Sequence, residues 1–162
     1  MELKKQILRL LAEDGRMSAR DMAERLDSDE KTIADMIEQL ERDKVIFGYC
    51  AMFDETELPE NAVKAIIEVK IRPERDGGFD KIARRLSRFP QVSSLYLMSG
   101  GFDLMVEVKG RNLNEVAMFV SSKLATIDGV LSTATHFLLK KYKEAGKLLQ
   151  EEEPHERLQV TP

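Results

Sequence analysis

The sequence predicts an α+β fold in two parts: an N-terminal winged-type helix-turn-helix and a C-terminal ferredoxin-like βαββαβ sandwich domain. Three observations support this prediction. Apolar residues in positions 1–47 recur every three or four residues, the period of a helix that buries one face. Residues 62–141 instead alternate β-type and helical stretches. Between them, residues 48–61 leave the helical period and contain a proline, which indicates an extended linker.

Two short helices begin the first part. The apolar face of the first helix is expected to consist of Leu3, Ile7, Leu10 and Leu11. Gly15 is placed to end this helix. Ser18 is expected to cap the second helix, and Asp21, three residues later, can reach back to it as a short-armed capping box. The buried face of the second helix is predicted to be Met22, Ala23 and Leu26.

A third helix follows after a short turn. Asp27 and Ser28 are expected to cap it, and two further acids lie in its first turn, where carboxylates suit the positive end of the helix dipole. Apolar residues then fall at offsets 0, 3, 4 and 7, and they are Ile33, Met36, Ile37 and Leu40. Two short helices joined by a tight turn after a packing helix have the shape of a helix-turn-helix. Residues 45–53 change the period and are expected to be extended.

The second part has the order strand, helix, strand, strand, helix, strand. Its strands are predicted at residues 64–72, 92–98, 104–108 and 130–139. Its helices are predicted at residues 79–89 and 112–124, the second with a capping box of Asn112 and Glu115 and a stop at Gly129. Turns are expected at residues 73–78 and 99–101.

This order predicts a four-stranded antiparallel sheet with both helices on one face. The other face has no cover within the chain, so we expect two subunits to pair through it. Residues 142–162 form the predicted C-terminal tail. Residues 140–153 are expected to be partly helical, and the polar end after Pro154 is expected to be frayed.

Composition excludes several classes of protein. No apolar run approaches the roughly 20 residues that span a membrane, and the N-terminus lacks the apolar core of a signal peptide. We therefore expect a cytoplasmic protein with no membrane partner. Cys50 is the single cysteine and there are two histidines, so no intrachain disulfide and no zinc pattern are expected. The sequence predicts neither a metal nor a cofactor.

Charge is distributed unevenly along the chain. Residues 1–50 carry 9 basic and 12 acidic side chains, a net charge of −3. Residues 60–141 carry 13 basic and 9 acidic side chains, a net charge of +4. Because contacts with nucleic-acid phosphates need lysine and arginine, the part with the helix-turn-helix pattern is the less suited of the two by charge.

Three stretches, in order, resemble a known family. Val45-Ile46-Phe47-Gly48-Tyr49 follows the third helix, and Gly100-Gly101-Phe102-Asp103 lies between the second and third strands. Thr133-Ala134-Thr135, apolar residues and Lys140-Lys141 end the second part. Together with the element order, these stretches resemble the leucine-responsive regulatory protein/AsnC, or feast/famine, family over residues 2–141. The resemblance implies a transcription regulator that binds double-stranded operator DNA, responds to an amino-acid effector, and forms homodimers that assemble into tetramers or octamers.

The third helix departs from the family pattern. Asp35 and Met36 stand where family members carry arginines, and Lys44 replaces a glycine. Residues 28–43 carry 2 basic and 6 acidic side chains, and acids can recognise base edges only at cytosine amino groups. The predicted DNA-binding residues are therefore Arg16, Ser18, Arg20, Lys31, Thr32, Gln39 and Arg42. A solvated helix face explains the same residues.

The Gly100–Asp103 turn is the predicted effector site. Exposed amides of such a turn can hold a carboxylate, Asp103 can pair with an ammonium group, and an amino acid carries both groups. The predicted effector-binding residues are Leu97, Met98, Ser99, Gly100, Gly101, Phe102, Asp103, Thr133 and Thr135. A ligand-free tight turn, and threonines that are simply suited to strands, explain the same pattern.

No catalytic motif is found. Gly77-Gly78 lacks the Lys-Ser/Thr of a phosphate loop, and no Gly-x-Ser-x-Gly occurs. We therefore predict a protein that is not an enzyme. Two alternatives stay open: a ligand-binding and oligomerisation protein that has lost DNA binding and acts through a paralogue, and an enzyme that uses His136.

Overall fold

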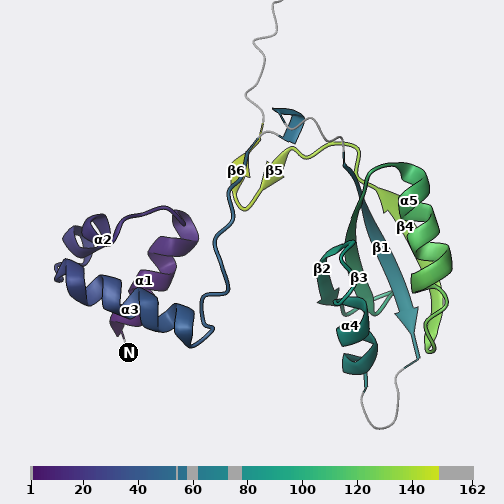
Figure 1. The fold of residues 1–162 in the computed structure, drawn as a ribbon, viewed down its shortest axis with the longest axis horizontal. Coiled ribbons are helices and arrows are strands. Elements are labelled where there is room, and N and C mark those ends of the chain that lie inside the picture. Colours follow the sequence, from purple (N-terminus) through teal and green to yellow (C-terminus); the bar gives the residue numbers. More distant parts are fainter. Residues whose placement is uncertain (1, 54, 58–61, 73–77, 150–162) are drawn as a thin grey trace, which may run out of the picture. The chain divides into compact units, whose positions relative to one another are not determined.

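The computed structural model describes residues 2–53, 55–57, 62–72 and 78–149. The chain divides into two compact units, residues 1–53 and residues 54–162 (Figure 1). Among the described residues, no helix is both long and apolar enough to cross a bilayer.

The first unit consists of three helices, as the apolar spacing predicts. They are α1 (Glu2–Glu13), α2 (Ala19–Leu26) and α3 (Glu30–Arg42). Each helix contributes side chains to one buried cluster, formed by Ile7, Met22, Ala23, Ile33 and Leu40. Partly buried residues such as Ile46 pack around this cluster, but residues 43–53 form no strand after α3.

The start of α3 differs from the expected one. Its N-cap is Asp29, whose carboxylate accepts a hydrogen bond of 3.0 Å from the Thr32 amide. The predicted cap at Asp27 and Ser28 is wrong, because Asp27 instead ends α2 in the left-handed conformation, with φ of 51°. The extended backbone of Asp29 is what places a side-chain oxygen over the first-turn amides.

The second unit has the predicted ferredoxin-like order. Its elements are β1 (Val63–Ile71), α4 (Asp80–Leu86), β2 (Val92–Leu97), β3 (Leu104–Gly110), α5 (Leu113–Phe119), a π-helical turn η2 (Val120–Leu124) and β4 (Val130–Phe137). A short 3₁₀ turn η1 (Glu55–Glu57) precedes β1. The strands form one antiparallel sheet in the order β2-β3-β1-β4. Residues 73–77 of the turn predicted at residues 73–78 lie outside the described residues.

Both helices cover the same face of the sheet. Alternate residues of β1 and β3 are buried, from Ala65 to Ile71 and from Leu104 to Val108. They share one core with α4, α5 and η2, which contribute Ile82, Leu86, Val116, Phe119 and Leu124. In Figure 1 these two helices lie against the sheet. This confirms the predicted arrangement.

No described element covers the opposite face, which is called the open sheet face below. The strand register places Ile66, Met105 and Tyr96 on it: Tyr96 pairs with Met105, and Ile66 lies diagonally across from Met105, opposite Glu107. Charged side chains flank them, and His136 Nε2 lies 3.4 Å from Glu68 Oε1. The open sheet face is therefore a mixed surface of apolar and charged side chains.

The tail does not form the expected partial helix. Residues 143–148 form a hairpin of β5 (Lys143–Glu144) and β6 (Lys147–Leu148). Ala145 and Gly146 have φ of 44° and 82°, the pair of positive values that a two-residue hairpin turn needs. The expectation of a partial helix was wrong, because this turn reverses the chain and pairs the two short strands. Residues 150–162, including the expected frayed end, lie outside the described residues.

Candidate functional site

The exposed face of α3 is where the helix-turn-helix would meet DNA. At 100° per residue, Lys31, Asp35, Glu38 and Arg42 point away from the buried Ile33 and Leu40, and all four are exposed. The outermost row of α3 thus has a base at each end and two acids in the middle. The face therefore carries charges of both signs, and its two cations lie about 16 Å apart along the helix.

The predicted α3 residues differ in how they are engaged. Arg42 donates to Glu38 across 2.9 Å, one turn apart, and both side chains are well exposed. The Thr32 hydroxyl lies 3.4 Å from the capping oxygen of Asp29. Lys31 and Gln39 make no hydrogen bond or ion pair within the described part of the chain. These two side chains can therefore donate hydrogen bonds to DNA without breaking a contact seen in the described residues.

The predicted residues near α2 gather at its N-terminus. Ser18 is the N-cap: its hydroxyl accepts from the Asp21 amide at 3.1 Å and donates to the Asp21 carboxylate at 2.6 Å. This hydroxyl bond lowers the pKa of Asp21. Arg20 lies 3.6 Å from Glu24, and the Arg16 amide donates to Asp14. Ser18 is therefore engaged in capping, while the two arginine side chains are exposed.

Tyr49 makes a contact that the sequence does not predict. Its hydroxyl donates to Glu41 Oε1 at 2.9 Å, and its ring lies against Gly15. Burial, and the hydrogen bond with Glu41, raise the pKa of Tyr49. These contacts fasten the segment after α3 to the helix-turn-helix. No local pattern indicates this contact, since a tyrosine eight positions from a glutamate in a non-helical segment has no fixed geometry.

The turn between β2 and β3 is closed by hydrogen bonds at Asp103. The Met98 amide donates to the Asp103 carbonyl at 2.8 Å, and the Asp103 amide donates to the Val69 carbonyl at 3.0 Å. The Asp103 carboxylate also accepts from the Ile71 amide at 2.8 Å through Oδ2. Asp103 therefore ties the turn to the end of β1. Its second oxygen, Oδ1, makes no hydrogen bond within the described residues.

The outer side of this turn is open. Ser99, Gly100 and Gly101 are exposed, and Leu97 and Met98 before them leave 59% and 38% of their surface exposed. Gly100 has φ of +142°, a conformation that favours glycine. A Cβ added at Gly100 or Gly101 would meet nothing within 4 Å. Free space, backbone amides and apolar side chains therefore lie together at one end of the sheet.

The predicted threonines lie at the same end of the sheet but not beside the turn. Thr133 pairs with Val69 on one side of β1, and Leu104 pairs with Val69 on the other side. Two strand spacings, about 10 Å, therefore separate Thr133 from the turn, and Thr135 lies two residues further along β4. Both threonines are half-buried. The predicted effector residues do not close a single pocket within one copy of the chain.

The described residues include no group of three or more histidine, cysteine or acidic side chains that could hold a metal ion. Cys50 is exposed.

Two family models match the chain. A winged helix-turn-helix DNA-binding model matches residues 2–46, and the Lrp/AsnC ligand binding domain model matches residues 64–148. The chain is 41% identical over 162 residues to the HTH-type transcriptional regulator YugG of Bacillus subtilis, covering 99% of this chain and 98% of that protein. It is also 31% identical to the Bkd operon transcriptional regulator of Pseudomonas aeruginosa, over 83% of this chain and 87% of that protein.

Solved structures share the fold. One is AsnC of E. coli, with a TM-score of 0.64 and 19% identity over 89% of this chain and 95% of that chain. Another is the L-Met complex of a transcriptional regulator from Neisseria meningitidis. It has a TM-score of 0.67 and 24% identity over 89% of this chain and 92% of that chain.

Proposed function

The chain belongs to the Lrp/AsnC family of transcriptional regulators, and from this premise we propose that an amino acid bound at residues 97–103 controls how its helix-turn-helix binds operator DNA. The open turn that Asp103 fastens to β1 is the observation that carries the effector part of this proposal.

The proposed DNA contacts follow from the positions of the exposed donors on α3. In a helix-turn-helix the N-terminal residues of the second helix meet base edges in the major groove, and here those are Lys31 and Thr32. Gln39 can pair with adenine, and Arg42 can exchange Glu38 for a phosphate because an exposed ion pair is weak. Arg16, Ser18 and Arg20 approach the backbone from the start of α2.

Loss of DNA binding is the less favoured alternative. The acidic face of α3 suggests this alternative. The DNA-binding family model, however, matches residues 2–46, which include all of α3.

The proposed effector is an α-amino acid with an apolar side chain. Backbone amides of residues 99–101 would hold its carboxylate, and Asp103 Oδ1 would accept from its ammonium group. Leu97 and Met98 would contact its side chain. That a regulator of the same fold has been solved with L-Met supports this class of ligand. Thr133 and Thr135 lie across β1, and their pairing with Val69 and Ile67 puts them on the helix-covered side of the sheet. We therefore infer that they contribute to the site only from another copy that reaches this side.

A second copy is proposed to pair through the open sheet face, which carries Ile66, Met105 and Tyr96. A two-fold dimer presents two α3 helices to a two-fold operator, and dimers would associate into tetramers or octamers. The effector can shift DNA binding only if its affinity differs between two assembly or conformational states.

Fluorescence anisotropy with the full chain tests this proposal. The probes are the DNA upstream of its own gene and a shuffled duplex, each with and without individual amino acids. We expect tighter binding to the upstream DNA and a shift of its dissociation constant, of the order of 5- to 150-fold, with at least one apolar amino acid. Equal binding to both duplexes at low salt, unchanged by every amino acid, would contradict it.

A further inference from the structure

The outer face of α4 concentrates positive charge. It is defined here by Lys81, Arg84 and Arg85 of this helix and by Arg88 just after its end, which are all exposed. From residue 80 to residue 88 the chain carries these four basic residues and one acidic residue, a net charge of +3. Four cations thus lie within about two and a half helical turns.

Among the described residues, the arginines of this face have few bonding partners. Arg84 Nη2 lies 3.7 Å from Asp80 Oδ2, and more than 70% of each side chain is exposed. Exposed ion pairs of this kind contribute little, so the guanidinium can leave Asp80 for a stronger anion. Arg85 and Arg88 make no ion pair within the described residues. Their forked donors suit phosphate oxygens in particular.

A shallow groove adjoins the arginines. It has a volume of about 290 Å³, runs between α4 and β2, and is lined in part by Arg84, Ser87, Ser93 and Ser94. The hydroxyls of Ser87 and Ser93 donate to backbone carbonyls, while the Ser94 hydroxyl makes no hydrogen bond within the described residues. The groove therefore places a guanidinium and a hydroxyl donor beside a space that can receive a phosphate group.

The charge distribution favours DNA as the partner. The helix-turn-helix unit is net negative, and residues 28–43 around α3 have a net charge of −4. Affinity for duplex DNA depends chiefly on lysine and arginine that replace counterions along the phosphates. We therefore propose that the outer face of α4 is a second, sequence-independent contact with the DNA backbone, which supplies charge that α3 lacks. This proposal rests on the proposed function, since it requires a DNA-binding regulator.

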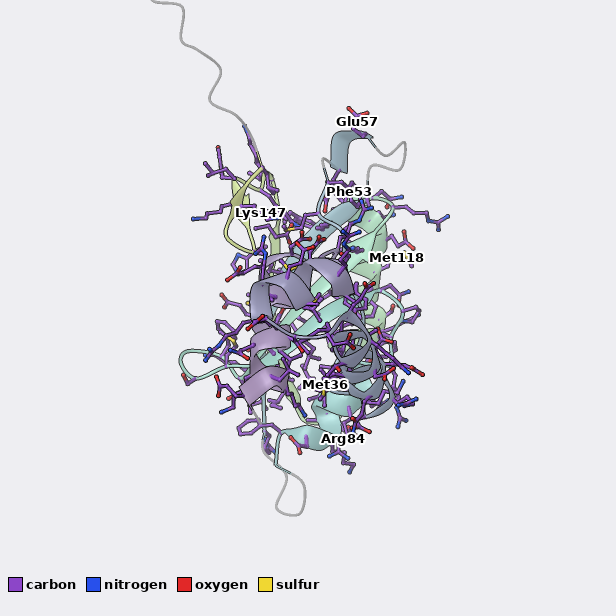
Figure 2. The ribbon with its side chains drawn as sticks, turned by 90° about the vertical axis from the view of Figure 1, so that its left-hand side faces the viewer. Met36, Phe53, Glu57, Arg84, Met118 and Lys147 are labelled. Carbon is purple, nitrogen blue, oxygen red and sulfur yellow. The ribbon has the colours of Figure 1, made fainter. Side chains whose placement is uncertain are left out.

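Salt-dependent DNA binding by the full chain tests the proposal. The variant combines Arg84→Gln, Arg85→Gln and Arg88→Gln, and the matched control combines Lys140→Gln, Lys143→Gln and Lys147→Gln in and beside the C-terminal hairpin. Each removes three exposed cations from the same unit; Arg84 and Lys147 are labelled in Figure 2. The probes are the upstream DNA and a long duplex of random sequence, with salt varied from about 50 to 200 mM.

We expect the α4 variant to weaken binding to both duplexes alike. The slope of log K against log salt should fall by about 0.9 for each lost phosphate contact, and so by two to three in total. Replacing the same arginines by lysine should restore most of the slope, because charge is kept. Arg88→Gln alone should lower the slope by about one. Because Arg88 lies after the end of α4, this single variant keeps the test valid if the triple variant does not fold.

Three results would overturn the proposal. The first is an unchanged slope in the α4 variant, and the second is an equal loss in the hairpin control. The third is a change of self-association without a change in DNA affinity, which would identify an acidic surface of another copy as the partner. These results differ from a failure of the proposed function. In that case the wild-type chain would show no preference for upstream over random DNA, whereas the α4 variant should keep the wild-type ratio of the two affinities. A wild-type chain that binds no duplex overturns both.

Discussion

The Ile71 amide donates a hydrogen bond of 2.8 Å to Oδ2 of Asp103, 32 positions away. This contact joins the last residue of β1 to the turn before β3, where direct pairing of the two strands has ended at Val69 and Leu104. One carboxylate oxygen therefore extends the sheet in place of a backbone carbonyl. The same residue has a structural role through Oδ2 and a proposed ligand-binding role through Oδ1.

Two substitutions of Asp103 separate these roles. Asp103→Asn keeps a side-chain oxygen for the Ile71 amide, so its stability should stay close to that of the wild type. Asp103→Ala leaves a part-buried amide without a partner and should lower the free energy of unfolding by about 1–3 kcal/mol. Both should weaken amino-acid binding, because each removes the negative charge. Urea denaturation and isothermal titration calorimetry measure the two effects, and unchanged amino-acid affinity in Asp103→Asn would leave Asp103 a structural residue only.

The open space at Gly101 gives a second test of the effector site. A Cβ there meets nothing within 4 Å, so Gly101→Ala should leave the folded chain undisturbed. If a ligand carboxylate approaches the backbone amides of this turn, the added methyl group should weaken amino-acid binding at least several-fold. Gly48→Ala is the matched control, since Gly48 also has free space around its Cα and lies in the other unit. Equal binding by both variants would exclude a ligand over Gly101.

Much of the fold follows from local periodicity. The alternation of Ile67, Val69 and Ile71 with polar residues fixes which face of β1 is buried, and the spacing of Ile33 and Leu40 does the same for α3. These patterns work because a strand repeats every two residues and a helix every 3.6. The capping role of Asn112, whose side chain accepts from the Glu115 amide at 2.9 Å, is equally local.

The features that the sequence did not predict depend on contacts between different segments of the folded chain or on individual backbone angles. Asp103 with Ile71 and Tyr49 with Glu41 are hydrogen bonds that only the assembled units bring together. Gly129 was expected only to stop a helix. It also has φ of +91°, and a Cβ there would lie 2.6 Å from Ile82 Cδ1, so α4 packs onto its bare backbone. Sequence spacing cannot indicate such a close approach.

The ion pair between Arg42 and Glu38 predicts the effect of neutralising α3. Glu38→Gln removes one negative charge beside the DNA and weakens the hold on Arg42, which should then contact a phosphate. Affinity for any duplex should rise several-fold, with the salt slope steeper by about 0.9. Glu13→Gln, which removes an exposed charge from the end of α1, should have little effect. Weaker binding by Glu38→Gln would show instead that Glu38 itself contacts DNA, as a carboxylate can at a cytosine amino group.

Glu115 predicts a pH dependence of stability. Its carboxylate accepts from the Arg111 backbone amide at 2.7 Å and from the Arg111 guanidinium at 3.1 Å, and these bonds lower the pKa of Glu115, the backbone bond most. Because the pKa is lower when folded, the stabilisation is present above the ordinary pKa of a glutamate and is lost as the pH falls through the folded value.

Melting temperatures measured from neutral to acid pH should show this loss. Glu115→Gln should melt below the wild type at neutral pH, and the difference should shrink as the pH falls through the folded pKa. Arg111→Ala keeps the backbone amide and should therefore retain most of the pH dependence. A constant difference between Glu115→Gln and the wild type at every pH would assign the effect to packing and not to ionisation.

The open sheet face predicts how subunit pairing can be broken without unfolding the monomer. Ile66 lies between Glu107 on β3 and His136 on β4, so in Ile66→Lys the introduced lysine has an opposite charge across the strand and the single sheet should remain folded. Buried in a subunit interface, the same charge would be costly, so sedimentation should show a shift toward monomer. Leu113→Lys on α5, where the leucine is 57% exposed, is the control and should keep the wild-type assembly. If Ile66→Lys sediments as the wild type does, the subunits associate through a surface other than the open sheet face.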